Sequence, residues 1–120
     1  MREERLRATA GLRQASLPLS SWRGRSGRRY IVGVHPLAEP DVLDVIDAVI
    51  IAVRRDQNGT AHVIDIATAG SRPSQEARTR WMTDVQARGA TEMHVHRLAE
   101  SDEERRAIMD DLREDESEPS

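Results

Sequence analysis

The segment that most constrains the fold runs from residue 47 to residue 70 and has the sequence DAVIIAVRRDQNGTAHVIDIATAG. Residues 48–53 are continuously apolar and rich in β-branched side chains, which predicts a strand covered on both faces. Residues 56–59 supply turn chemistry, because Asn and Gly tolerate the positive φ angles of short hairpin loops. Residues 63–66 resume the strand pattern. The segment therefore predicts a β-hairpin whose first strand lies inside a sheet.

Two more segments have strand patterns. Residues 29–35, RYIVGVH, are rich in strand-forming side chains, and Pro36 ends this strand, which we expect beside the hairpin. Residues 91–98, TEMHVHRL, alternate two apolar residues with two histidines, His94 and His96. Such alternation predicts a half-buried strand and supplies the third strand of the core.

Two segments in the second half of the chain have helix patterns. Residues 73–88 place an apolar row on one face and end with a cation followed by Gly89, which is typical of a helix C-terminus. Residues 101–114 begin with a capping box formed by Ser101 and Glu104, and apolar residues recur at helical spacing after it. Both segments are therefore predicted to be helices.

The chain length and composition predict one domain with loose ends. The 120 residues suffice for a single domain, and a hydrophobic content of 38% supports a modest core. We expect an α/β (α+β) domain at residues 28–114, with a small three- to four-stranded, mainly antiparallel sheet flanked by two helices. Residues 1–27 are expected to form a flexible Arg-rich arm, and residues 115–120 an acidic disordered tail.

Composition also excludes several classes of site and location. The chain has no cysteine, which excludes disulfides, thiolate catalysis and zinc sites with sulfur ligands. No apolar run approaches the roughly 20 residues of a membrane span, and the N-terminal residues lack the apolar core of a secretory signal. No phosphate-binding glycine loop is present. We therefore expect a cytoplasmic protein with no cofactor and no membrane contact.

The net charge of −3 conceals a strong asymmetry between the two ends of the chain. Residues 1–29 carry a balance of +6, whereas residues 99–120 carry a balance of −7. The basic end favours an anionic partner, while the acidic end would repel nucleic acid or occupy the basic arm itself. Trp22 lies among the arginines of the basic end. We expect it either to pack against the domain or to stack on a nucleobase.

The order strand, strand, helix, strand, helix resembles that of small stand-alone proteins of the GIY-YIG nuclease superfamily, over about residues 28–113. The segment GRRYIVGVHPL is followed by DAVIIAVRR at the place of the GIY strand and by DIATAG at the place of the YIG strand. The segment GATEMHVHRLAESDEERRAIMDDL then matches the later strand and helix. The order and spacing of these segments carry the resemblance, and it implies a GIY-YIG-like fold.

The resemblance also implies that the family's catalytic groups are missing. The two tyrosines that position water and phosphate in the family fall on Ile50 and Asp65, and Ala67 stands where the second motif has glycine. The metal-binding glutamate falls on Met109. Isoleucine and methionine can neither position a nucleophile nor hold a metal. The place of the family's arginine can be taken by any of three residues: Arg72, Arg78 or Arg80.

A rearranged nuclease site stays open at the level of sequence. Asp65, together with Asp110 or Asp111, can replace the missing carboxylate. A one-position shift on a helix turns a side chain by about 100°, however, and aims it away from the old site.

The histidines allow two interpretations. His94 and His96 project from the same face of one strand, about 7 Å apart, and can share a metal with His35 or His62. Alternatively, the two histidines line a partly wet face of the sheet. We expect Arg54 and Arg55 to form a solvated strand end.

The sequence leads to three hypotheses of function. The first is a non-catalytic GIY-YIG-like accessory protein that binds nucleic acid through phosphate contacts. The residues expected to make those contacts are Arg23, Arg25, Arg28, Arg29, Arg72, Arg78 and Arg80. The second is a protein-interaction or regulatory module whose basic arm and acidic tail pair with a protein partner or by self-association. The third is a metal-dependent nuclease with a rearranged site.

Overall fold

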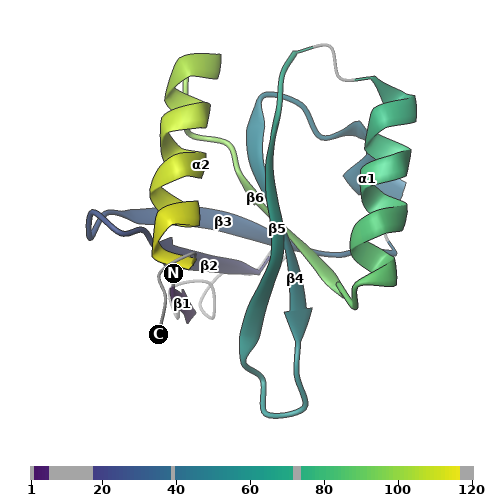
Figure 1. Ribbon diagram of the computed structural model, residues 1–120, viewed down its shortest axis with the longest axis horizontal. Coiled ribbons are helices and arrows are strands. Elements are labelled where there is room, and N and C mark those ends of the chain that lie inside the picture. Colours follow the sequence, from purple (N-terminus) through teal and green to yellow (C-terminus); the bar gives the residue numbers. More distant parts are fainter. Residues whose placement is uncertain (1, 6–17, 39, 72–73, 117–120) are drawn as a thin grey trace, which may run out of the picture.

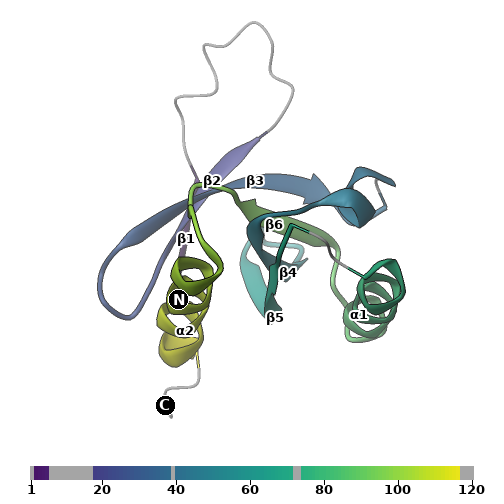
Figure 2. The ribbon, with the colours of Figure 1, turned by 90° about the horizontal axis from the view of Figure 1, so that it is seen from above.

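The computed structural model describes residues 2–5, 18–38, 40–71 and 74–116. In this part of the chain, six strands form one antiparallel sheet in the order β1-β2-β3-β6-β4-β5, and the two α-helices lie on opposite sides of β4 and β5 (Figures 1 and 2). The elements, in chain order, are β1 (Arg2–Arg5), β2 (Leu19–Arg23), β3 (Arg29–Pro36), the 3-10 helix η2 (Pro40–Asp44), β4 (Ala48–Arg55), β5 (Ala61–Ala69), α1 (Gln75–Ala87), β6 (Glu92–His96) and α2 (Asp102–Glu116).

The predicted hairpin is confirmed as β4 and β5. The first six residues of β4 are buried, and the strand lies between β5 and β6, as a run of apolar residues predicts. In the connecting turn, the side chain of Asp56 accepts hydrogen bonds from the N–H groups of Asn58 (2.8 Å) and Thr60 (3.0 Å). Gly59 has φ of 84°, a conformation that glycine adopts without steric cost. Local turn chemistry therefore sets the register of this hairpin.

The strand predicted at residues 91–98 is confirmed as β6, but the prediction that it is half-buried is wrong. His94 and His96 are 0% and 5% exposed, and Met93 and Val95 on the other face are also buried. Two layers cover β6, because α1 packs on the face of Met93 and α2 packs on the other face of the sheet. The alternation of residue types in β6 therefore separates two buried faces, and does not separate a buried face from an exposed one.

The two helices are confirmed within two residues of their predicted ends, and each covers its own half of the core. Ser74 caps α1 by accepting a hydrogen bond from the N–H of Ala77 at 3.1 Å, and Ser101 accepts from the N–H of Glu104 at the same distance. On one face, α1 buries Met82 and Val85, which pack with Leu37, Val42, Val45, Ala48, Ile50, Ala52, Ala90, Met93 and Val95. On the other, α2 buries Ile108 and Leu112, which pack with Trp22, Tyr30, Val32, Val49, Ile51, Val53, Ile66 and Ala99.

The N-terminal strands enlarge the sheet beyond the predicted three to four strands. Residues 1–27 are predicted to form a flexible arm, whereas β1 and β2 are hydrogen-bonded members of the sheet. Trp22 is 1% exposed, which confirms that it packs against the domain. β2 has the sequence LSSWR, in which two serines and one large aromatic side chain do not form a recognisable apolar pattern. Residues 6–17 and 117–120 lie outside the described part of the chain.

Neither helix of the described part of the chain has both the length and the apolar character needed to cross a membrane.

Candidate nucleic-acid interface

The turn between β2 and β3 gathers four of the predicted phosphate-binding residues, and we call residues 23–29 the arginine hairpin. Arg23 and Arg29 form a directly opposed pair at the ends of the two strands. Arg25 and Arg28 lie in the turn, and all four side chains are exposed. The guanidinium carbon of Arg28 lies 5.4 Å from the ring centroid of Tyr30, which is within the range of a cation–π contact.

Glycines shape the arginine hairpin. The N–H of Gly24 donates to the carbonyl of Arg28 at 2.9 Å, and the N–H of Gly27 donates to the carbonyl of Gly24 at 3.0 Å. Gly27 has φ of 93°, where a side chain would strain the backbone. The sequence RGRSGRR therefore forms a tight turn in which Arg23 and Arg25 flank Gly24, and Arg28 follows Gly27.

The pair formed by Arg23 and Arg29 lies on the sheet face that α2 does not cover. Trp22 and Tyr30, the next opposed pair, face α2, and successive side chains of a strand alternate between faces. Along the same face as the arginines, Ile31 is 45% exposed. The register therefore places two exposed arginines side by side on this face.

The carboxylate of Asp111, on α2, contacts the arginine hairpin. It accepts hydrogen bonds from the N–H of Ser26 (2.8 Å), the hydroxyl of Ser26 (2.8 Å) and the hydroxyl of Tyr30 (2.7 Å). Burial alone would raise the pKa of Asp111, but these hydrogen bonds outweigh it, and the pKa lies below its usual value. Burial and the bond to Asp111 raise the pKa of Tyr30 to about 12. Asp111 is therefore ionised and Tyr30 neutral at pH 7.

Arg78 does not belong to this surface, and the prediction that it contacts nucleic acid is wrong. Its side chain is buried, and its two terminal nitrogens donate to the carbonyls of Val42 (2.9 Å) and Val45 (2.7 Å). Burial lowers the pKa of Arg78. The signal was present in the sequence, because Arg78 precedes Met82 and Val85 by four and seven residues and so shares their face of α1.

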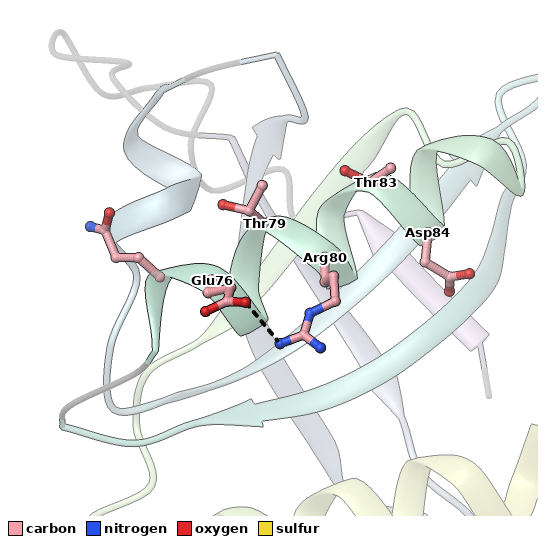
Figure 3. Close-up of a pocket in the computed structure, with 6 residues that line it drawn as sticks. Glu76, Thr79, Arg80, Thr83 and Asp84 are labelled. Atoms are coloured by element: carbon pink, nitrogen blue, oxygen red, sulfur yellow. Dashed lines mark ion pairs between the residues drawn. The ribbon is translucent and has the colours of Figure 1, made fainter.

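Arg80 is exposed but lies on another side of the molecule. It forms a 3.9 Å ion pair with Glu76, and Figure 3 shows the two side chains turned toward each other along the outer face of α1. An open hollow of about 650 Å³ lies over this face, lined by Gln75, Glu76, Thr79, Arg80, Thr83 and Asp84. The arginine hairpin and α1 lie at opposite ends of the molecule in both ribbon views (Figures 1 and 2). Arg72 lies outside the described residues. Of the predicted phosphate-binding residues that the structure describes, only the four arginines of the hairpin share one exposed segment.

The positions aligned with the GIY-YIG catalytic groups do not meet in one cleft. Ile50 is 2% exposed and faces α1, beside a cavity of about 220 Å³ that Ala67 and Trp81 also line. Met109 packs on the other face of the sheet. Asp65 accepts a hydrogen bond from the indole N–H of Trp81 at 2.8 Å.

The histidines do not come together in the shared metal site that was one of their two interpretations. His94 accepts from the indole N–H of Trp22 at Nδ1 (2.9 Å), and its Nε2 lies 2.9 Å from Glu92. Nδ1 of His96 lies 2.8 Å from the carbonyl of Ile31. His35 is buried, and His62 pairs with Asp56. Among the described residues, no group of three or more histidine, aspartate or glutamate side chains could hold a metal ion. Asp110, which was considered as a replacement for the missing carboxylate, is exposed on α2.

Sequence reasoning missed a half-buried network around Arg55, which is not the solvated strand end that we expected. Its guanidinium donates to both carboxylate oxygens of Glu3, at 2.6 and 3.0 Å, and to both of Glu92, at 2.8 and 3.2 Å. Burial alone would raise the pKa values of Glu3 and Glu92, but the bonds to Arg55 outweigh it and lower both. Through Glu92 the network continues to His94. It ties β1 and β4 to β6 and uses residues 52 positions apart, so no local pattern signals it.

Comparisons of the chain with models of known protein families, with curated proteins and with solved structures give no match. The resemblance to the GIY-YIG superfamily therefore rests on the order and spacing of sequence segments alone. The arginine hairpin is a candidate binding surface because of its geometry.

Proposed function

We propose that the protein is a non-catalytic, GIY-YIG-like accessory domain that binds nucleic acid through the arginine hairpin. The observation that carries the proposal is the register that opposes Arg23 to Arg29 and leaves Arg25 and Arg28 in the turn between them. Four exposed guanidinium groups on one short segment offer forked donors that match phosphate oxygens. The rest of the molecule is acidic, so this local concentration of positive charge sets where an anion docks.

The contacts go to the phosphate backbone rather than to the bases. Stacking on single-stranded bases needs exposed aromatic rings. Trp22 and Tyr30 are 1% and 4% exposed, and Trp81 is half-buried on the far side of the molecule with its N–H bonded to Asp65. Phosphate contacts carry no sequence information directly, so binding is expected to be independent of sequence and strongly salt-dependent.

The absence of catalysis is supported by the surroundings of the three aligned positions. A nuclease needs a nucleophile-positioning group and a metal ligand at one place. Ile50 and Met109 lie on opposite faces of the sheet, and Asp65 is bonded to Trp81. Incubation with supercoiled plasmid and Mg²⁺ or Mn²⁺ tests this point. Nicking by the wild-type protein that disappears in Asp65→Ala would establish the nuclease alternative instead.

Fluorescence anisotropy with a labelled duplex oligonucleotide, titrated between about 50 and about 200 mM salt, tests binding. Four phosphate contacts predict that log K falls with log salt with a slope of about −3.6. The double variant Arg25→Gln/Arg28→Gln should weaken binding and reduce the slope by about 2. The matched control, Arg54→Gln/Arg80→Gln, removes the same charge from exposed positions outside the hairpin and should retain the wild-type slope. Salt-independent affinity, or equal loss in both double variants, would overturn the proposal.

A protein partner is the second candidate, favoured by Ile31. This side chain is 45% exposed on the same face as Arg23 and Arg29, and a mixed apolar and basic surface also suits an acidic protein segment. Solution mass measured at low and high salt discriminates between the candidates. A salt-sensitive dimer without affinity for nucleic acid would favour self-association, and a monomer at both salt concentrations would exclude it.

A further inference from the structure

We infer that Asp111 is the positioning residue of the arginine hairpin, so that it strengthens the binding of nucleic acid although its own negative charge opposes it. The inference rests on the proposed function and concerns how the same surface is held. Asp111 lies on α2, more than 80 residues along the chain from the hairpin, and its side chain is half-buried between the two elements.

The carboxylate of Asp111 accepts hydrogen bonds from the turn and from Tyr30 of β3. One oxygen accepts from the N–H of Ser26, and the other accepts from the hydroxyls of Ser26 and Tyr30. The main chain adds a fourth bond, because the N–H of Arg25 donates to the carbonyl of Asp111 at 3.1 Å. The side chain and backbone of Asp111 thus hold Arg25 and Ser26 of the hairpin and Tyr30, the residue that follows it.

Steric fit supports the same conclusion. A Cβ atom placed on Gly24 would overlap the carboxylate of Asp111, so a side chain at this position would displace the carboxylate. The turn and the helix are therefore fitted to one another at Gly24 and Asp111, and this contact is not a loose encounter of two surface groups.

Two routes connect Asp111 to Arg28, one to its backbone and one to its side chain. The hydroxyl of Ser26, which Asp111 holds, accepts from the N–H of Arg28 at 3.3 Å. The ring of Tyr30, whose hydroxyl Asp111 also holds, lies under the guanidinium of Arg28. A turn fixed in this way loses less conformational entropy when it binds a ligand than a mobile turn does. Asp111 therefore pre-organises the arginines that meet phosphate.

Neutralisation of Asp111 has opposite expected effects on anion binding, depending on whether the residue positions the turn or acts only through its charge. If Asp111 were only a neighbouring negative charge, its neutralisation would strengthen the binding of an anion. If it positions the turn, neutralisation weakens binding, because an amide cannot accept all three side-chain and backbone donors that the carboxylate accepts. Asp110 provides a matched control, because it is the neighbouring residue of α2, carries the same charge and is exposed.

The experiment compares Asp111→Asn with Asp110→Asn by anisotropy with a labelled duplex oligonucleotide. We expect Asp111→Asn to bind roughly three- to tenfold more weakly than the wild type, and Asp110→Asn to bind equally well or more tightly. Tyr30→Phe and Ser26→Ala each remove one donor and should show the same direction with smaller loss. Tighter binding by Asp111→Asn than by the wild type would overturn the inference.

Hydrogen exchange without nucleic acid separates this inference from the proposed function. The amides of Arg25 and Ser26 donate to Asp111, so they should exchange faster in Asp111→Asn and at the wild-type rate in Asp110→Asn. Unchanged exchange in Asp111→Asn would overturn the positioning role. If instead the wild-type protein shows no salt-dependent binding while exchange responds as expected, the proposed function fails and the contact between α2 and the turn stands.

Discussion

The indole N–H of Trp22 on β2 donates a hydrogen bond to Nδ1 of His94 on β6, and the two atoms lie 2.9 Å apart in the core. An indole nitrogen can only donate, so Nδ1 of His94 must accept. The proton of the neutral ring is then on Nε2, which lies 2.9 Å from the carboxylate of Glu92. One buried contact therefore fixes both the charge and the tautomer of His94.

The first prediction concerns pH. Burial lowers the pKa of His94, although Glu92 and Glu3 oppose this shift. The unfolded chain therefore takes up a proton near pH 6.5, before the folded protein does, and the stability associated with His94 is lost as the pH falls from there toward the lower folded value. Denaturant unfolding of the wild type and of His94→Gln measures this. The stability difference between the two proteins should shrink below pH 6.5, and a difference that is constant with pH would contradict the assignment.

A second prediction follows from the donor in the same contact. Trp22→Phe keeps an aromatic ring in the core but leaves Nδ1 of His94 without its hydrogen bond. We expect the free energy of unfolding to fall by about 1–3 kcal/mol, as for a buried polar group that loses its partner. Trp81→Phe provides the comparison, because its lost partner, Asp65, is half-exposed and can bond to water. Urea unfolding should therefore show a larger loss for Trp22→Phe.

The third prediction tests why Arg78 is buried. Arg78→Met fills a similar volume but leaves the carbonyls of Val42 and Val45 without the guanidinium that now donates to them. The free energy of unfolding should fall by about 1–3 kcal/mol. Arg80→Met, two residues further on the exposed face of α1, should change stability by less than about 0.5 kcal/mol. Equal effects of the two substitutions in urea unfolding would mean that the carbonyl contacts contribute little.

The fourth prediction concerns the outer edge of the sheet. Arg88 of α1 donates to the carbonyl of Ile64 at 2.7 Å, and Arg113 of α2 donates to the carbonyl of Ile66 at 3.1 Å, both on the edge strand β5. Unpaired carbonyls on an edge strand are a template for another strand, and charged side chains placed there block such pairing.

We therefore expect the double variant Arg88→Gln/Arg113→Gln to self-associate as the protein concentration rises, as measured by light scattering after gel filtration. Arg54→Gln/Arg106→Gln makes the same change in net charge at exposed positions and serves as the control. Equal association of the two double variants would attribute the effect to net charge rather than to the edge of β5.

Local sequence patterns predicted the elements whose conformation is set by residues only a few positions away in the sequence. The apolar run of β4, the turn at Gly59 and the cap formed by Ser101 each act within a few residues, and all appear where predicted. β2 was missed because Trp22 supplies nearly all of its apolar burial, and one aromatic residue among serines and arginines has no period.

The candidate site was only partly predictable. The positive charge of residues 1–29 pointed to the arginines of the hairpin. Charge alone, however, predicts neither the register of these arginines nor the burial of the Arg78 side chain. Asp111 was considered only as a metal ligand, because its contacts with Ser26 and Tyr30 span 85 and 81 residues. Contacts at such separations depend on the tertiary fold, and a single sequence gives no local sign of them.

The position of β6 between β3 and β4 has a consequence for the growing chain. Two antiparallel ribbons, β2 with β3 and β4 with β5, can form from neighbouring segments as soon as each is synthesised. They share no backbone ladder until β6, a strand of five residues, is inserted between them. A nascent chain that ends before residue 92 thus exposes two open inner edges, and the domain becomes one cooperative unit only when its last strand has left the ribosome.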